Sequence, residues 1–251
     1  MFWPLLILFC CLVLLTQWTT KHIQGVGYLI TGDGQIALYL YFVLIFPGVL
    51  IHELSHALTA SLMGVKVRRL SIGIRRKGRG GQVALGSVDI AGTGPIRASL
   101  IGLAPFVAGC FAILAIGGMV FGLRLPAPFT LPRFWQELQS AYHVPDFWLW
   151  AYLVFAISNA LLPSTADRRA WGTTLLFLLA LGALAYFSGL LDGVPSVRRA
   201  SIALGRWLED AAGQLTYAFA IAVLVDLVVA AALLVVEQML ALLGLGRLHY
   251  R

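Results

Sequence analysis

Six apolar stretches divide this chain, and each is long enough to cross the hydrocarbon core of a bilayer, which is about 30 Å thick. We predict membrane spans over residues 2–19, 37–63, 98–122, 147–163, 170–190 and 215–244. Of the 251 residues, 60% are hydrophobic and 12% are charged, too little charge to cover a soluble globule of this size. The sequence therefore predicts a single all-α polytopic membrane domain over residues 1–251 and excludes soluble and disordered classes.

Basic residues are concentrated on one side of these spans. In a six-span chain, the loop 64–97, the loop after residue 163 and the C-terminus share one face and hold 12 of the 18 Lys and Arg residues. Because positively charged loops stay in the cytoplasm, we expect both termini to be cytoplasmic. The compact layout favours a bacterial plasma membrane. Lipid head groups account for the net charge of +7, so we expect no nucleic-acid partner.

The segment between the second and third spans has the alternating pattern of β-strands. Polar and apolar residues alternate over residues 65–68 and 70–74, and a Gly-rich basic turn follows over residues 75–81. Residues 82–90 can return as a second strand. The pattern predicts a small β-hairpin over residues 65–90, and the alternative is a solvated basic loop.

The second span contains His52-Glu53-Leu54-Ser55-His56, an HExxH sequence. Residues i and i+4 of a helix share one face, so both imidazoles can reach one metal ion while Glu53 can reach a water molecule beside it. In zinc hydrolases the metal lowers the pKa of water toward about 7, and a carboxylate takes the proton. A chance HExxH is expected on the order of 0.002 times in such a chain, and ionisable groups inside a span are functional by default. We predict one Zn²⁺ per chain, with Glu53 as the catalytic base.

A catalytic zinc site needs a third protein ligand and one open position. The other histidines, His22, His143 and His249, are predicted to lie in loops or at the terminus. The acidic candidates are Asp167, Asp192, Glu209, Asp226 and Glu237. Asp167 has a structural alternative, because residues 164–167 form a capping-box pattern at the start of the fifth span.

The HExxH sequence and the segment 158–167 together resemble the site-2 protease family of intramembrane zinc metalloproteases. The second motif of that family places an Asn eight residues before a ligand Asp, with a proline between them, and Asn159, Pro163 and Asp167 match this order. The resemblance implies that Asp167 is the third ligand and that Asn159 helps to hold the substrate or the site. It covers about residues 36–170, which we take as the protease core.

The predicted topology also favours Asp167. The second and fourth spans both run toward the cytoplasm, so His52, His56 and Asp167 arrive at the same depth, whereas Asp192 follows the fifth span and emerges on the opposite face. Glu237 stays open as an alternative, because another group of membrane zinc proteases uses a Glu as third ligand. Glu209 and Asp226 rank lower.

The sequence thus predicts an intramembrane zinc metalloendopeptidase that cuts a peptide bond in or near a transmembrane segment, on the cytoplasmic side. Its expected partners are the lipid bilayer and a transmembrane protein substrate. The hairpin resembles the β-element that site-2 proteases place beside the active site, where an unwound substrate can add as an extra strand. The alternative is a non-catalytic membrane pseudoprotease, scaffold or zinc-binding protein. Glu53 counts against it, since zinc binding alone needs no general base.

Overall fold

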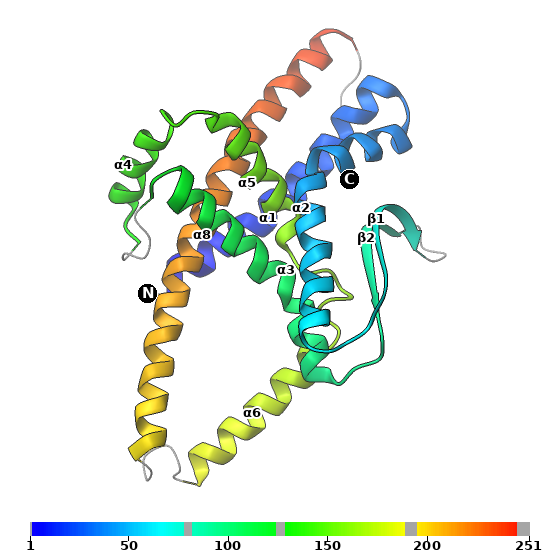
Figure 1. Cartoon of the computed structure of the whole chain (residues 1–251). Helices are drawn as coiled ribbons and strands as arrows, with labels where there is room; N and C mark the ends of the chain where they lie inside the picture. Colours follow the sequence, from blue (N-terminus) through cyan, green and yellow to red (C-terminus); the bar gives the residue numbers. More distant parts are fainter. Residues whose placement is uncertain (1, 78–81, 124–128, 189–194, 245–251) are drawn as a thin grey trace.

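The computed structural model describes residues 2–77, 82–123, 129–188 and 195–244, and it consists of a helical bundle with one β-hairpin at its side (Figure 1). Four helices are long and apolar enough to cross a membrane. They are α1 (Phe2–Thr31), α2 (Gly34–Leu62), α3 (Pro95–Ala115, extended by a π-helical turn over Ile116–Val120) and α8 (Pro195–Leu242). The predicted helical class is thus confirmed, with helices that could cross a membrane. The number of spans stays a prediction, because α5 (Phe147–Leu161) and α6 (Trp171–Phe187) are shorter.

Local signals in the sequence set the limits of α2 and α3. The side chain of Asp33 caps α2 by accepting hydrogen bonds from the backbone N–H groups of Gln35 and Ile36. At the other end Gly64 adopts a φ of +68°, the left-handed conformation that ends many helices. α3 begins at Pro95, whose missing N–H is not needed at the first helical position. α2, the helix that carries HExxH, therefore starts after Asp33 and ends before Gly64.

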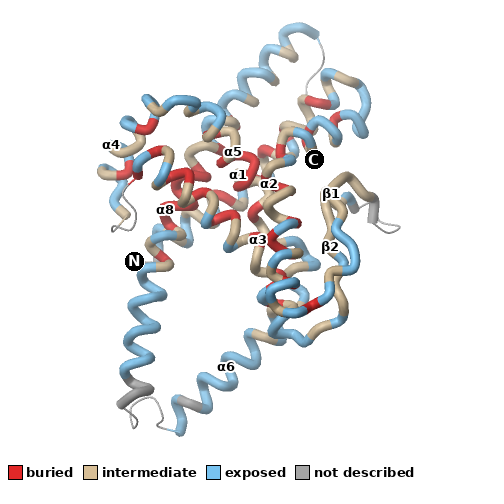
Figure 2. Tube along the Cα trace, in the orientation of Figure 1, coloured by how far each residue is buried: buried red, intermediate tan, exposed pale blue. Residues whose placement is uncertain are grey.

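The buried residues gather where α1, α2, α3, α5 and α8 meet (Figure 2). α2 and α5 approach closely at Gly48, where an added Cβ would lie 1.9 Å from the carbonyl oxygen of Ala156. Small residues allow such backbone contact between membrane helices. This contact brings the HExxH segment of α2 against the end of α5.

The predicted β-hairpin is confirmed. β1 (Val67–Lys77) pairs antiparallel with β2 (Gln82–Ile90), with Ile72 opposite Gly86 in the register. Residues 78–81 of the predicted turn lie outside the described residues. The sequence did not predict α4 (Leu131–Ala141), because its few apolar residues, such as the buried Phe134, are spaced along one helical face within a polar segment.

α1 and the second half of α8 run in the same direction. The Phe9 and Phe219 ring centroids are 5.6 Å apart, and farther along both helices His22 Nδ1 lies 2.6 Å from Glu237 Oε1. Six alternating spans would make the first and last helices antiparallel and would place both termini on one side. In the structure the first and last helices are instead parallel.

The difference arises at α6, which extends away from the bundle together with the first half of α8 (Figure 1). α6 is held near its start, where the Thr174 hydroxyl bonds the Ser99 hydroxyl at 2.7 Å and the Pro95 carbonyl at 3.2 Å. From there it does not return alongside the other helices. Its apolar side chains are therefore largely exposed (Figure 2).

Candidate metal centre

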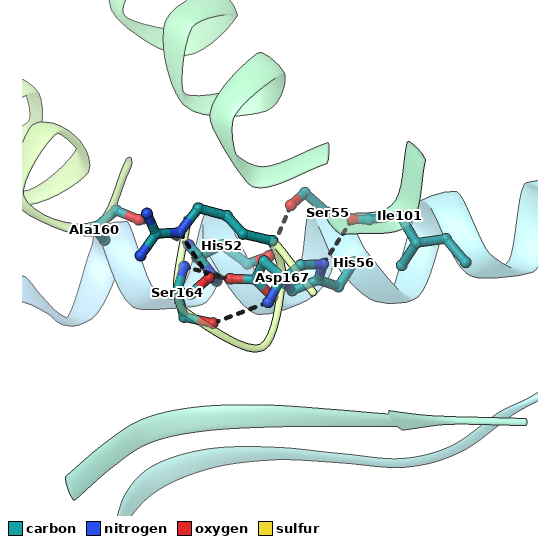
Figure 3. A network of polar contacts seen from close by, with 8 residues as sticks. His52, Ser55, His56, Ile101, Ala160, Ser164 and Asp167 are labelled. Atoms are coloured by element: carbon teal, nitrogen blue, oxygen red, sulfur yellow. Dashed lines mark hydrogen bonds and ion pairs between the residues drawn. The ribbon is translucent and has the colours of Figure 1, made fainter. Parts of the chain in front are cut away.

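The loop after α5 brings Asp167 to the two histidines of α2 (Figure 3). His56 Nε2 lies 3.1 Å from Asp167 Oδ1, and His52 Nε2 lies 3.7 Å from Asp167 Oδ2. The three ligand atoms lie within 4.8 Å of one another. Tetrahedral zinc, with bonds of 2.0 to 2.2 Å, holds its ligand atoms about 3.4 Å apart. Small side-chain adjustments would therefore let these residues hold one metal ion.

Both imidazoles are oriented by backbone carbonyls of neighbouring helices. His52 Nδ1 lies 2.7 Å from the Ala160 oxygen on α5, and His56 Nδ1 lies 2.8 Å from the Ile101 oxygen on α3. Because a carbonyl oxygen only accepts, each Nδ1 donates to it, and each Nε2 faces Asp167, where it can donate to the carboxylate when protonated or bind a metal ion through its lone pair when neutral. Metal-binding histidines have this second hydrogen bond in almost every known site.

Asp167 is held by hydrogen bonds within its own loop. Its Oδ2 accepts a hydrogen bond of 2.7 Å from the Ser164 backbone N–H, and its own N–H donates to Ser164 Oγ at 3.3 Å. The capping-box bonds predicted from the sequence are therefore present, although α6 starts only at Trp171. The same carboxylate faces both histidines, so the turn and the ligand roles are compatible.

The charge state of Asp167 also suits a ligand. Burial acts to raise the pKa of the Asp167 carboxyl, but the facing imidazoles of His52 and His56 and the hydrogen bonding with Ser164 outweigh burial and hold the pKa well below its usual range. The carboxylate is therefore ionised at neutral pH, as metal binding requires.

β2 covers Glu53, the predicted catalytic base. An added Cβ at Gly86 would lie 2.3 Å from Glu53 Oε1, so a larger residue there would displace the Glu53 side chain. Glu53 is buried, and with His52, His56 and Asp167 it lines one cavity of about 790 Å³. The predicted base and the three predicted ligand residues thus line the same cavity.

The cavity continues along one face of α2 beyond the histidines. Tyr41, Ile45 and Val49 line it at helical spacing, and β2 and the loop carrying Asp167 line its other sides. Eleven residues of helix separate Tyr41 from His52, which corresponds to roughly 16 Å. The cavity is therefore long enough for several residues of an extended peptide.

The other acidic candidates lie elsewhere. Glu237 is paired with His22, and Asp226 accepts hydrogen bonds from Ser158 and Asn159. Glu209 is exposed on the first half of α8, and Asp192 lies outside the described residues. Among the described residues, His52, His56 and Asp167 form the one group of three whose ligand atoms could meet at a metal ion.

Asn159 lines the cavity, but its amide is used inside the protein. Its Nδ2 donates to the Phe155 carbonyl and to Asp226, and its Oδ1 accepts from Thr19. Of the two roles that the resemblance implies, the geometry fits holding the site better than holding the substrate. Sequence reasoning ranked Asp226 low as a ligand and did not link it to Asn159, although an acid within an apolar span was itself a signal.

Comparison with known proteins identifies no relative of this chain. No family model, no curated protein and no solved structure matches the chain.

Gly102 on α3 offers a test of how Asp167 is positioned. A Cβ at Gly102 would lie 2.2 Å from the Asp167 carbonyl oxygen, so we expect Gly102→Ala to push the loop away from the histidines. Metal affinity, measured by chelator competition on detergent-purified protein, should fall about 10- to 100-fold, as for other supporting residues of metal sites. Gly172→Ala is the matched control, since nothing lies within 4 Å of its added Cβ. Equal affinity in the two variants would show that α3 does not position Asp167.

Proposed function

We propose that this chain is an intramembrane zinc metalloendopeptidase, similar to the site-2 proteases, which hydrolyses a peptide bond in or near a transmembrane segment. One observation carries the proposal. His52, His56 and Asp167 converge within 4.8 Å in a cavity that Glu53 also lines, and the HExxH residues belong to an apolar helix long enough to cross a membrane.

The residues present fit zinc. Two neutral imidazole nitrogens and one carboxylate are ligands that catalytic zinc sites use, with a fourth position left for water or substrate. When bound, the metal would polarise a peptide carbonyl and lower the pKa of water. Glu53 is placed to take a proton from the attacking water and to return it to the leaving amine. Burial of Glu53 under β2 would keep bulk water from competing for that proton.

The edge of β2 supports a peptide as the substrate. β1 pairs with one edge of β2, and in the described residues no strand covers the other edge. Residues 83–90 line the cavity, so an extended peptide could pair with them by backbone hydrogen bonds. A transmembrane helix would first have to unwind, because its own hydrogen bonds protect its amides. Apolar Ile45 and Val49 would then face the side chains of the substrate.

The packing supports five crossings rather than six. α5 ends beside the metal ligands, and α8 is one continuous helix that runs parallel to α1. The chain between α5 and the second half of α8 therefore starts and finishes on the hairpin side, and α6 makes no crossing of its own. We propose that α1, α2, α3, α5 and α8 span the membrane and that apolar α6 lies in lipid on the hairpin side.

Charge distribution favours this arrangement. With the first half of α8 on the hairpin side, that face holds 13 of the 18 Lys and Arg residues, against 12 in the six-span arrangement. The positive-inside bias then places the hairpin and the start of α1 in the cytoplasm, and the end of α8 on the opposite side. The active site opens toward the cytoplasmic face in both arrangements.

Cysteine labelling distinguishes the two topologies. In a variant with Cys10, Cys11 and Cys110 replaced by alanine, Ser201→Cys should react with a membrane-impermeant maleimide from the same side as Lys66→Cys. Reaction of Ser201→Cys from the same side as Gly34→Cys would instead support six spans. All three introduced cysteines lie at exposed positions, so accessibility within the fold does not bias the result.

Glu53→Gln tests catalysis separately from metal binding. The amide keeps the size of the side chain but cannot accept the proton, so we expect peptide cleavage to fall by about 10²-fold or more while bound zinc stays unchanged. The measurement compares new N-termini in the membrane proteome of cells that produce wild type, Glu53→Gln or the exposed control Glu209→Gln. Cleavage products that persist with Glu53→Gln would favour the non-catalytic scaffold or zinc-binding alternative.

A further inference from the structure

Asp226 is a buried acid in the apolar half of α8 that the proposed reaction does not use. We propose that Asp226 is a positioning residue of the metal centre, which acts through Asn159 and the last turn of α5 to orient His52. This inference rests on the proposed metal centre and assigns a role in it to a helix that contributes no ligand.

The first step is the contact between α8 and α5. Asp226 is completely buried, and its Oδ1 accepts hydrogen bonds of 3.1 Å from both Ser158 Oγ and Asn159 Nδ2. Its Oδ2 is also buried and has no hydrogen-bond partner among the described residues. A carboxyl group placed here in a span is costly and needs a specific reason. In this structure the Asp226 carboxyl group holds two consecutive residues of α5, Ser158 and Asn159.

The second contact lies at the end of α5, where the side-chain amide of Asn159 joins three helices. Asn159 also donates to the Phe155 carbonyl at 2.9 Å and accepts from Thr19 of α1 at 3.1 Å, so α1, α5 and α8 meet at this one amide. α5 stops two residues later, at Leu161. Asp226 and Thr19 therefore fix the orientation of the last turn of α5.

The end of α5 in turn contacts the predicted metal ligand His52. The last carbonyls of a helix have no partner inside the helix. Ala160, next to Asn159, directs its free carbonyl at His52 Nδ1, 2.7 Å away. A rotation of this turn would move the carbonyl and with it the imidazole ring, so the bonds to Asp226 set the direction of His52 Nε2 toward the metal.

Cobalt provides a readout that depends on ligand geometry. Co²⁺ bound in place of Zn²⁺ gives visible absorption bands that change with the arrangement of its ligands, and titration with Co²⁺ gives its affinity. The experiment uses the detergent-purified full chain with Co²⁺ alone, so it needs no substrate. The variants are Asp226→Leu, which removes the acceptor, and Asp226→Asn, which keeps an oxygen in the same place.

We expect Asp226→Leu to shift the cobalt bands and to weaken Co²⁺ binding about 10- to 100-fold, and Asp226→Asn to restore both. The matched control is Glu237→Leu, which removes another acid of the second half of α8 from its contact with His22, outside the metal centre. It should leave the bands unchanged. Should Asp226→Leu fail to accumulate, Asn159→Ala breaks the same connection from the α5 side and should shift the bands in the same way.

Wild-type bands and affinity in Asp226→Leu, or in Asn159→Ala, would overturn the proposal. An equal shift in Glu237→Leu would also overturn it, because the effect would then reflect general loosening of α8. A wild-type chain that binds no Co²⁺ would overturn the metal centre itself, so failure of the proposed function is distinguishable from failure of this inference.

Discussion

Two hydrogen bonds from histidine Nδ1 to backbone carbonyls organise this molecule. His52 and His56 lie in an apolar helix, where an unpaired polar group is costly. Carbonyls of Ala160 on α5 and Ile101 on α3 satisfy them. Each bond joins α2 to a different helix and turns Nε2 of the ring toward Asp167. The same two hydrogen bonds therefore hold α2 against α3 and α5 and set the geometry of the candidate metal centre.

Glycine positions show how closely the surrounding backbone approaches that centre. Gly48 allows α2 to contact α5, Gly102 allows α3 to contact the Asp167 loop, and Gly86 allows β2 to pass over Glu53. In each case a Cβ would lie less than 2.5 Å from a neighbouring atom. The proposed base and ligands are thus enclosed by backbone on several sides, which suits a hydrolytic site that must admit one peptide and limit bulk water.

The helical class, the hairpin and the convergence of His52, His56 and Asp167 could be predicted because each depends on local periodicity or on a spaced motif. The direction of α8 could not, because it follows from long-range contacts such as Phe9 with Phe219 and His22 with Glu237. Because its residues are apolar, the sequence predicted that α6 crosses the membrane. An apolar helix of 17 residues can also lie in the lipid without crossing it. The glycine contacts and the Asp226 network likewise depend on tertiary packing.

The central claim is that Asp167 completes a zinc site with the two histidines, and zinc content per chain tests it most directly. Elemental analysis of detergent-purified protein should find about one zinc in wild type and in Glu237→Ala, and almost none in His56→Ala and Asp167→Ala, because a site with two remaining ligands binds zinc weakly. Zinc retained by Asp167→Ala but lost from Glu237→Ala would contradict the account, and so would a wild-type chain without zinc.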